Sequence, residues 1–394
     1  MTLSHKIALD PTVKQEQYFR RAAGIARFVW NWALAQWKER YEHGEKPNAL
    51  HLKKLWNERK GKEYPWVYEV HKDVNQQPFT NLQKAFQRFF KGESGHPQFK
   101  KKGVHDSFYV SNDKLKVDAM RLSIPRLGWV KMREELRFTG KVLGATVSRE
   151  ADRWFVSLQV DVGDHYTRTR TGDGIVGVDL GVTTLATLST GEKIESPKPL
   201  KRLLERLKTA QRRVSRKVKG SHNRRKAVQR LARLHRRIKN TRHDVLHKFT
   251  SKLTSENQVV AIEDLHVRGM MANHTLAQAV SDMGCHEFRA QLAYKAQLTG
   301  AQVVVVDRWF PSSKTCSQCG AYHEGLTLAT RTMRCDCGLE RDRDHNAAIN
   351  LARVGYTRSH ACGDTSGGGT MATSVYERRV VEAGTTPCAL LHTM

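Results

Sequence analysis

A single acidic residue inside an apolar stretch constrains the fold of this chain more than any other feature. Residues 175–188 are mostly β-branched and apolar on both sides of Asp179, and a glycine-containing turn interrupts them. This pattern predicts the start of a β-hairpin. A carboxylate in a buried strand is unfavourable unless a positive charge compensates it, and a divalent cation is the usual solution. Asp179 is therefore a candidate metal ligand.

Two later segments place further acids at the ends of predicted elements. Residues 259–262 form an apolar run that ends at Glu263, and Asp342 and Asp344 precede a predicted helix. Either aspartate could simply cap that helix. Three acids at the ends of separated elements are what a two-metal site that cleaves phosphodiester bonds needs. Together with Asp179, these residues form the candidate site.

The overall charge of the chain points to a polyanionic partner. Its 394 residues include 67 Lys and Arg against 39 Asp and Glu, which gives a formal net charge of +28. An excess this large predicts binding to nucleic acid. The chain has no apolar run long enough to span a membrane, and its first residues lack the apolar core of a signal peptide. We therefore expect a soluble, cytoplasmic protein of two or three domains without a membrane partner.

The positive charge is densest between the first two acids. Residues 198–248 contain 20 Lys and Arg against only Glu205 and Asp244. Apolar residues recur at helical spacing on both sides of a turn at residues 220–223, so residues 198–250 are predicted to form a hairpin of two helices. Such a hairpin would pack its apolar seam on the core and display its charge to a polyanion, either RNA or DNA.

Four cysteines form two close pairs that are typical of a tetrahedral zinc ribbon. The second pair has the tighter C-x-C spacing, so His323 or His345 could substitute as a ligand. We favour the four cysteines within residues 308–341, and a site made only of cysteines is closed and therefore structural. The expected zinc ligands are Cys316, Cys319, Cys335 and Cys337.

The remaining patterns divide the chain into further regions. Residues 1–107 begin with a short strand and continue with helical patterns, and residues 108–168 contain short alternating runs that predict a small antiparallel β-barrel. Residues 356–394 are rich in Gly, Ser and Thr, which indicates a disordered tail.

At this point the motifs can be compared with a known family. Their order and combination, from about residue 4 to residue 355, resemble TnpB, the insertion-sequence-encoded, RNA-guided nucleases related to type V CRISPR effectors. The motifs that carry the resemblance are Gly177–Gly181, Ile262–Leu265, Phe310–Gly320 and Asp342–Asn350, together with the N-terminal segments Ala26–Asn31 and His96–Lys102.

The resemblance implies an α/β fold in which residues 172–355 form a RuvC (RNase H-like) nuclease domain with an inserted zinc ribbon. It also implies an N-terminal helical lobe and a β-barrel that grip the guide RNA. Mg²⁺ would be bound by Asp179, Glu263 and Asp344, with Asp342 the less favoured third ligand, and Zn²⁺ by the four cysteines.

The function that follows is an RNA-guided, Mg²⁺-dependent DNA endonuclease that cuts next to a short motif and acts as a monomer. Its partners would be a non-coding RNA from the transposon end and double- and single-stranded target DNA. Two alternatives remain at this stage. The chain could be an RNA-guided DNA-binding regulator that does not cut, or a transposase that transfers DNA strands.

Overall fold

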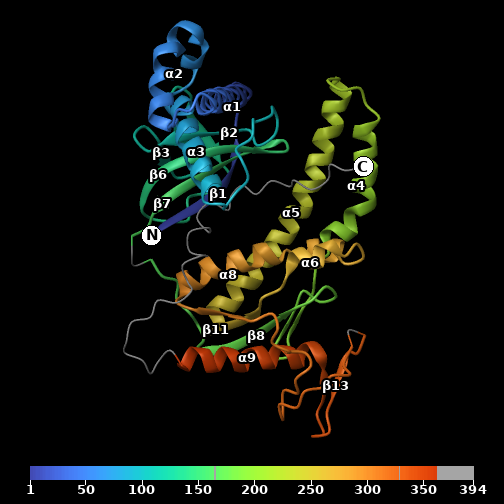
Figure 1. The fold of residues 1–394 in the computed structure, drawn as a ribbon. Helices are drawn as coiled ribbons and strands as arrows, with labels where there is room; N and C mark the ends of the chain where they lie inside the picture. The colour runs from blue at the N-terminus through green and yellow to red at the C-terminus, as the bar shows by residue number, and fades with distance from the viewer. Residues whose placement is uncertain (164–165, 328, 362–394) are drawn as a thin grey trace. The chain divides into compact units, whose positions relative to one another are not determined.

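The structure is a computed structural model that describes residues 1–163, 166–327 and 329–361. It divides into two compact units, Met1–His165 and Tyr166–Met394. Figure 1 shows a helical and sheet portion in the first unit and a layered sheet and helix portion in the second. Most of the tail predicted over residues 356–394 lies outside the described residues, whereas residues 356–361 continue a helix.

The helices of the first unit lie near its N-terminus. They are α1 (Val13–Glu42), α2 (Ala49–Glu63), the short 3-10 helix η1 (Pro65–Glu69) and α3 (Lys72–Phe90). Helix α1 begins with a capping box, in which the Thr12 side chain accepts a hydrogen bond from the Gln15 backbone and the Gln15 side chain accepts one from the Thr12 backbone. On its buried face, Phe19 packs 5.2 Å from the ring of Trp154, so α1 is attached to the sheet of the same unit.

The strands of the first unit form one antiparallel sheet in the order β2-β6-β7-β1-β5-β4-β3. Strand β1 pairs with β7 over Thr2–Ala8 and with β5 at Leu9 and Asp10, so it joins two sets of strands. The strands are β1 (Thr2–Asp10), β2 (Ser107–Ser111), β3 (Lys116–Asp118), β4 (Arg121–Ile124), β5 (Gly128–Met132), β6 (Lys141–Glu150) and β7 (Arg153–Asp161).

The predicted β-barrel is corrected by this sheet. In the described part of the chain no pairing joins the end strands β2 and β3, so no closed barrel is present. Alternating short strands indicate an antiparallel sheet, but closure depends on long-range pairing that the alternation does not encode. The N-terminal strand β1 lies in the middle of the sheet, which the sequence pattern did not predict.

The second unit is built on a five-stranded mixed sheet in the order β10-β9-β8-β11-β12. Strands β8, β9 and β10 are antiparallel neighbours, which confirms the predicted hairpin, whereas β8, β11 and β12 are parallel. The strands are β8 (Gly174–Leu180), β9 (Ala186–Leu188), β10 (Lys193–Ile194), β11 (Asn257–Glu263) and β12 (Gln302–Val306).

Helices cover both faces of this sheet, as Figure 1 shows for α8 and α9. On one face, Phe249 of α5 and Phe288 of α8 pack in a core with Val178 and Ile262. On the other face, Leu351 of α9 packs on Val259 and its neighbours. The helices are α4 (Pro199–Ser215), α5 (His222–Glu256), α6 (Val267–Ala272), α7 (Ala277–Met283), α8 (Cys285–Thr299) and α9 (Arg343–Ala361).

Helix α9 approaches strand β8 unusually closely at Gly177. A Cβ atom at this position would overlap the Ala348 carbonyl oxygen and would lie 2.6 Å from the Ala352 backbone nitrogen. A glycine is therefore required where the backbone of the helix meets the strand. This contact fixes the height of α9 above the sheet.

A small separate sheet follows β12. Strands β13 (Thr332–Arg334) and β14 (Glu340–Asp342) pair in antiparallel fashion. Met333 and Leu339 form a small core with the buried Cys316. Among the helices that the structure describes, none combines the length and apolar character needed to cross a membrane.

Candidate active site

The three predicted acids meet at the carboxyl ends of two parallel strands. Ala261 of β11 pairs with Gly177 of β8, and Gly177 faces α9. Because side chains alternate along a strand, Asp179 and Glu263, two residues further on, face the same side. Asp344 comes to this place in the first turn of α9. The fold therefore brings all three predicted acids to one edge of the sheet.

The electrostatic environment of Asp179 reflects its burial and the nearby acids. Burial raises the pKa of the Asp179 carboxyl well above its usual range, and the negative charges of Asp344 and Glu263 raise it further, although Arg343 opposes them. Burial also raises the pKa of Glu263, against the hydrogen bond from Ser312. Burial combined with close like charges is typical of functional sites, because a bound cation or a shared proton relieves it.

Asp342 has a different environment from Asp344. Its Oδ1 accepts hydrogen bonds from the backbone nitrogens of Asp344 (3.0 Å) and His345 (3.1 Å), and its Oδ2 lies 2.9 Å from Lys193 Nζ. Burial alone would raise the pKa of Asp342, but the contacts with Lys193 and His345 lower it overall. Asp342 therefore caps the start of α9, which is the structural role that the sequence left open.

Several polar residues around the acids were not identified from the sequence. Asp264, next to Glu263, pairs with Arg289 Nη2 (2.9 Å) and Arg308 Nη2 (2.6 Å), so its charge is already compensated. The Ser312 hydroxyl donates to Glu263 Oε1 at 3.3 Å. These partners come from α8 and from the loop after β12, and only the folded sheet reveals their proximity.

The four cysteines form a compact cluster. In the described part of the chain they are the only group of three or more potential metal-ligating residues whose ligand atoms all lie within 4.8 Å of one another. The carboxylates therefore meet more loosely. The Cys316 and Cys337 sulfurs are 3.7 Å apart, and those of Cys319 and Cys335 are 3.5 Å apart. Zinc with Zn–S bonds of about 2.3 Å in a tetrahedron would separate its sulfurs by roughly 3.8 Å, so this cluster fits zinc.

The two histidines considered as alternative ligands are not part of this group. His345 Nε2 lies 3.2 Å from the Ser189 carbonyl oxygen, beside the five-stranded sheet. His323 donates its backbone N–H to Lys314 within the cysteine-bearing segment, but its ring is not among the clustered ligand atoms. The geometry thus favours the four-cysteine set.

Two buried asparagines connect the cysteine-bearing segment to α9. Asn346 Oδ1 accepts from the Ser317 backbone nitrogen at 2.8 Å, and its Nδ2 donates to the Thr315 carbonyl at 2.7 Å. Asn350 Nδ2 donates to the carbonyls of Ser312 and Thr315. The first cysteine pair is therefore attached to the helix turn that carries Asp344, a link that sequence reasoning missed.

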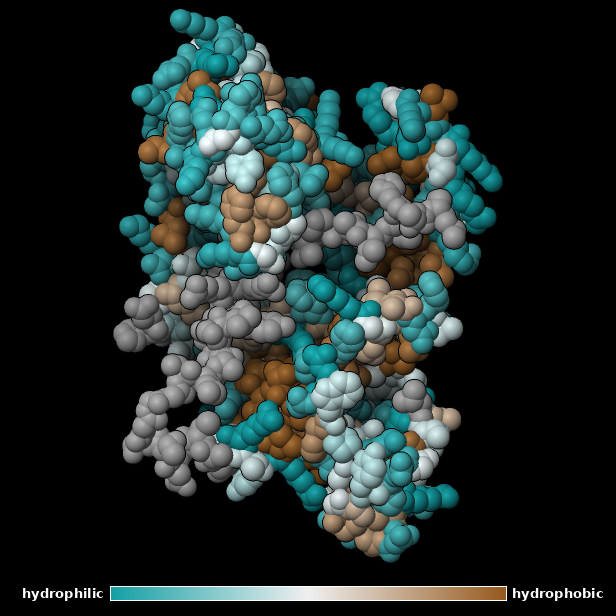
Figure 2. All heavy atoms as spheres, viewed as in Figure 1, coloured by the Kyte–Doolittle hydropathy of each residue, from teal (hydrophilic) through white to brown (hydrophobic). Residues whose placement is uncertain are grey.

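The basic hairpin predicted over residues 198–250 corresponds to helices α4 and α5. The buried Asp282 carboxylate accepts from the backbone nitrogens of Leu200 and Lys201 and so caps α4. The Arg224 guanidinium closes the turn by donating to the Val214 and Lys217 carbonyls. In Figure 2, hydrophilic residues cover most of the outer end of this hairpin.

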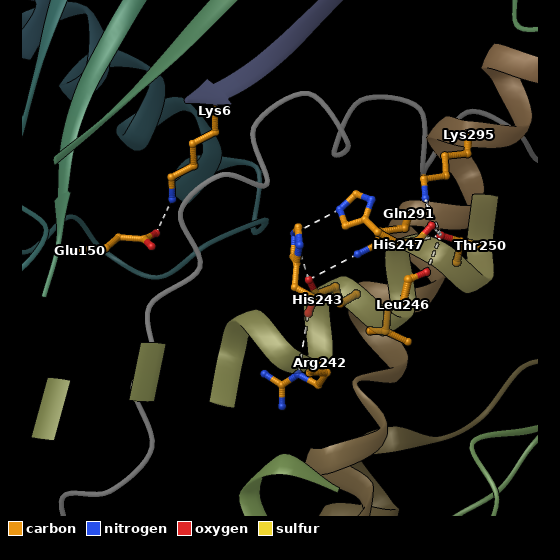
Figure 3. A network of polar contacts seen from close by, with 10 residues as sticks. Lys6, Glu150, Arg242, His243, Leu246, His247, Thr250, Gln291 and Lys295 are labelled. Atoms are coloured by element: carbon orange, nitrogen blue, oxygen red, sulfur yellow. Dashed lines mark hydrogen bonds and ion pairs between the residues drawn. The ribbon is translucent and has the colours of Figure 1, made fainter. Parts of the chain in front are cut away.

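The base of the hairpin is attached to α8 by a buried amine, as Figure 3 shows. Lys295 Nζ donates to the His247 carbonyl (2.7 Å), Thr250 Oγ1 (2.8 Å) and Ser251 Oγ (2.9 Å). Thr250 also contacts Gln291 Oε1 at 3.1 Å. The hairpin therefore leaves the core from a rigid, hydrogen-bonded base.

Comparison with known proteins agrees with this description. Family models match residues 1–46, as a helix-turn-helix domain of the OrfB IS605 type, and residues 156–274, as OrfB IS605, described as "Probable transposase". A third model, the TNB domain of Cas12f1-like proteins, matches residues 286–351.

Two relatives cover nearly the whole chain. A Streptomyces pristinaespiralis protein whose name describes an RNA-guided DNA endonuclease is 40% identical over 371 residues, which cover 91% of this chain and 90% of the relative. InsQ of Escherichia coli (strain K12), named in the same way, is 34% identical over 378 residues, covering 91% and 93% of the two chains.

A solved structure has the same fold. The cryo-EM structure of a complex of Cas12f1, sgRNA and target DNA superposes with a TM-score of 0.59 at 14% identity, covering 86% of this chain and 83% of that one. The protein is thus a mixed α/β protein with the fold of Cas12f1. The extensive identity with the two relatives defines it further: the chain belongs to the TnpB (OrfB) family of RNA-guided DNA endonucleases.

Proposed function

We propose that this protein is an RNA-guided DNA endonuclease, encoded by an insertion sequence, that hydrolyses phosphodiester bonds with the help of Mg²⁺. The observation that carries the proposal is the meeting of Asp179, Glu263 and Asp344 at one edge of the sheet. The acids come from three elements far apart in the sequence, and burial, together with the charges of the other two acids, raises the pKa of Asp179. Carboxylate oxygens are the ligands that Mg²⁺ prefers.

Each acid has its own task in this proposal. Asp179 is buried and experiences the negative charges of both Asp344 and Glu263, and the three carboxylates together would hold Mg²⁺. Ser312 donates to Glu263 Oε1 and so orients the remaining oxygen. The first turn of α9 presents Asp344, while Asp342 holds the backbone there. Bound Mg²⁺ would supply charge stabilisation and a water of lowered pKa at the scissile phosphate.

The cysteine cluster would hold a structural Zn²⁺. Four sulfurs at tetrahedral spacing leave no open position for a substrate. The cluster would act on the reaction only indirectly, by holding Thr315 and Ser317 against Asn346 and thereby fixing the start of α9. Zinc removal is then expected to weaken cutting by loosening Asp344.

Guide RNA and target DNA are the partners that the charge of the chain supports. The α4–α5 hairpin presents a nearly uniform positive surface to phosphate backbones, which provides affinity without reading sequence. Target choice would then come from pairing between the RNA and the DNA, next to a short motif that the protein reads.

The test is to express the full chain with the RNA encoded beside it, sequence the RNA that co-purifies, and assay DNA that matches its guide segment. We expect a discrete RNA and Mg²⁺-dependent cutting at the matched site. Single alanine substitutions of Asp179, Glu263 or Asp344 should abolish cutting but retain RNA and DNA binding. Asp342→Asn is the matched control, because asparagine can still cap α9 and cutting should persist.

The alternatives predict other outcomes. Tight guided binding without cutting in any divalent cation would favour the non-cleaving regulator. Joining of DNA ends would favour a transposase. Cutting that needs no RNA would remove the guided part of the proposal and leave the nuclease site in place.

A further inference from the structure

Trp309 is the most exposed large apolar side chain among the described residues, with 85% of its surface in solvent. Isolated exposed apolar residues are common and need no explanation by themselves. The position of Trp309 makes it informative, because the loop that carries it is attached on both sides to the end of the strand that holds Glu263.

The attachment involves residues 307–312, which follow β12. The last residue of β12, Val306, is in register with Glu263 on β11. At the start of the loop, Arg308 Nη2 lies 2.6 Å from Asp264 Oδ2. At its end, the Ser312 hydroxyl donates to Glu263 Oε1 at 3.3 Å. The indole therefore projects from a short loop anchored to a candidate catalytic acid and to its neighbour.

The local backbone determines which aromatic residue points outward. The Trp309 backbone nitrogen donates to Asp307 Oδ1 at 2.8 Å, and the Phe310 nitrogen donates to the Asp307 carbonyl at 3.1 Å. In this tight turn Phe310 packs against the core beneath α9. Trp309, on the preceding position, is directed to solvent instead. The anchored turn holds the indole in place without burying it.

We propose that Trp309 is a stacking platform for a nucleobase of the DNA strand that enters the acid site. The inference rests on the proposed nuclease function. A flat indole offers a surface on which any base can stack, so the contact would be tolerant of sequence. A protein partner would call for a contiguous apolar patch, whereas the exposed charged residues Asp307 and Arg308 directly precede Trp309 in its loop.

Such a stack would hold the nucleotide near the scissile bond in register with the acids. Loss of a single base–aromatic stack typically weakens binding by about fivefold to a hundredfold. The effect should depend on one particular nucleotide, because the anchored loop can reach only one position along a bound strand. That dependence separates stacking from a general loss of affinity.

The experiment combines a protein change with a substrate change. The full chain with its co-purified RNA is tested as wild type, Trp309→Ala and Trp309→Phe, with Tyr356→Ala as the matched control. Tyr356 is also an exposed aromatic residue, near the far end of α9 from Asp344. The substrates are single-stranded oligonucleotides complementary to the guide segment, each with one abasic site, tiled across the cut position.

We expect Trp309→Ala to slow single-turnover cutting of intact substrate by about tenfold. Trp309→Phe should restore most of the rate, and Tyr356→Ala should match wild type. One abasic position should slow wild type to a similar degree and should not slow Trp309→Ala further. Equal losses from every abasic position in both proteins would overturn the stacking role.

A second readout does not depend on cutting. With Ca²⁺ in place of Mg²⁺, 2-aminopurine at the sensitive position should be quenched by wild type and not by Trp309→Ala. If wild type quenches but never cuts, the stack is supported and the nuclease proposal fails. If wild type cuts, and Trp309→Ala matches it in both cutting rate and quenching, the stacking role is wrong and the nuclease proposal survives.

Discussion

The cysteine cluster and the carboxylate site differ in how the chain assembles them. The four cysteines lie within residues 316–337, and a tight turn with a positive-φ glycine, Gly320 or Gly338, follows each pair. The acids lie on β8, β11 and α9, so that more than 160 residues separate Asp179 from Asp344. The first set lies on one short segment with local turns, whereas the second forms only when the sheet and α9 have packed.

The two sets also differ in chemistry. Sulfur ligands at tetrahedral spacing form a closed site that suits zinc, whereas carboxylate oxygens, which are more loosely grouped here, suit a hard cation. Under the proposed function, this difference divides stability and reactivity between neighbouring parts of one unit. Asn346 and Asn350 connect these parts, so changes in one should be measurable in the other.

The largest expected effect comes from the carboxylate site. Asp179→Asn should reduce cutting by at least about a thousandfold, because in the proposed site a neutral amide would replace an anionic metal ligand. The same variant should be more stable than wild type in a chelator near pH 7. The raised pKa of Asp179 means that its ionised form opposes folding: the folded state gains stability below the pKa of the unfolded chain and loses it as pH rises through the folded pKa.

Both quantities can be measured on the same preparations, by single-turnover cutting in Mg²⁺ and by thermal melting in EDTA. A lower melting temperature for Asp179→Asn in EDTA would show that Asp179 supports the fold through contacts of its own. The distinction between a structural cysteine cluster and a reactive carboxylate site would then be wrong.

Disruption of the cysteine cluster should have a smaller effect on cutting and a larger one on local structure. Cys335→Ser should lose bound zinc and loosen the segment around it. Cutting should fall by about tenfold to a hundredfold, the usual consequence of disturbing groups that orient a metal ligand. Cys285→Ala is the control, since Cys285 lies in α8 outside the cluster.

Zinc content by elemental analysis and single-turnover rates would check this prediction. Cys285→Ala should keep its zinc. Loss of zinc from Cys335→Ser with an unchanged cutting rate would separate the cluster from the acid site and remove the role assigned to Asn346.

The contact between α9 and the sheet tests the coupling from the opposite side. Gly177→Ala would place a methyl group against the Ala348 carbonyl and the Ala352 nitrogen, and the helix would have to move. We expect a loss of stability of about 1–3 kcal/mol and slower cutting, since Asp344 moves with α9. Gly174→Ala on the same strand is the control, because its Cβ would meet only Asn257 Oδ1 at 3.6 Å.

Denaturant titration and single-turnover cutting would compare the two glycine variants. If Gly177→Ala and Gly174→Ala have the same stability and cutting rate, α9 tolerates a methyl group at residue 177. The close approach of α9 to β8 would then not position Asp344.

The sequence predicted those features that local patterns encode. The spacing of the cysteines predicted their cluster. The apolar residues around the two acids predicted that Asp179 lies within a strand and that Glu263 ends one, as they do in β8 and β11. The β8–β9 hairpin and the basic helical hairpin also followed from periodicity. Each of these depends on residues that are near one another in the chain.

Features that depend on long-range packing were missed or wrong. The predicted barrel is an open sheet, because closure requires pairing between distant strands. The residues alone left open whether Asp342 or Asp344 caps the helix, and only the resemblance favoured Asp344 as a ligand; the contacts of Asp342 with Lys193 and the start of α9 are visible only in the fold. Ser312 and Arg289 carry no local signal, since the sheet alone brings them to Glu263 and Asp264.

The smallest expected effect on cutting concerns a buried charge that the protein compensates without a metal. Lys295 is buried, and its three ammonium hydrogens meet three oxygens on α5 (Figure 3). Burial, and secondarily the charge of Arg168, lowers the pKa of Lys295 to about 7. The unfolded chain keeps an ordinary lysine pKa of about 10.4, so it binds more protons between these values. Stability contributed by this residue should therefore rise with pH across that window.

Lys295→Met should remove this pH dependence, and its matched control is Lys248→Met, an exposed lysine that pairs with Asp244 on the same helix that Lys295 contacts. One proton can contribute at most about 1.4 kcal/mol per pH unit, and hydrogen bonds to the ammonium group act by favouring the charged form in the folded state, which narrows the pH window. Denaturant titrations at several pH values from 7 to 10 would measure this pH dependence as the difference between wild type and each variant. Parallel profiles for wild type and Lys295→Met would mean that hydrogen bonding fully offsets burial. In that case burial of the Lys295 amine would cost no electrostatic free energy, unlike burial of the clustered carboxylates. Of the two buried sites, only the acid site would then need a bound cation.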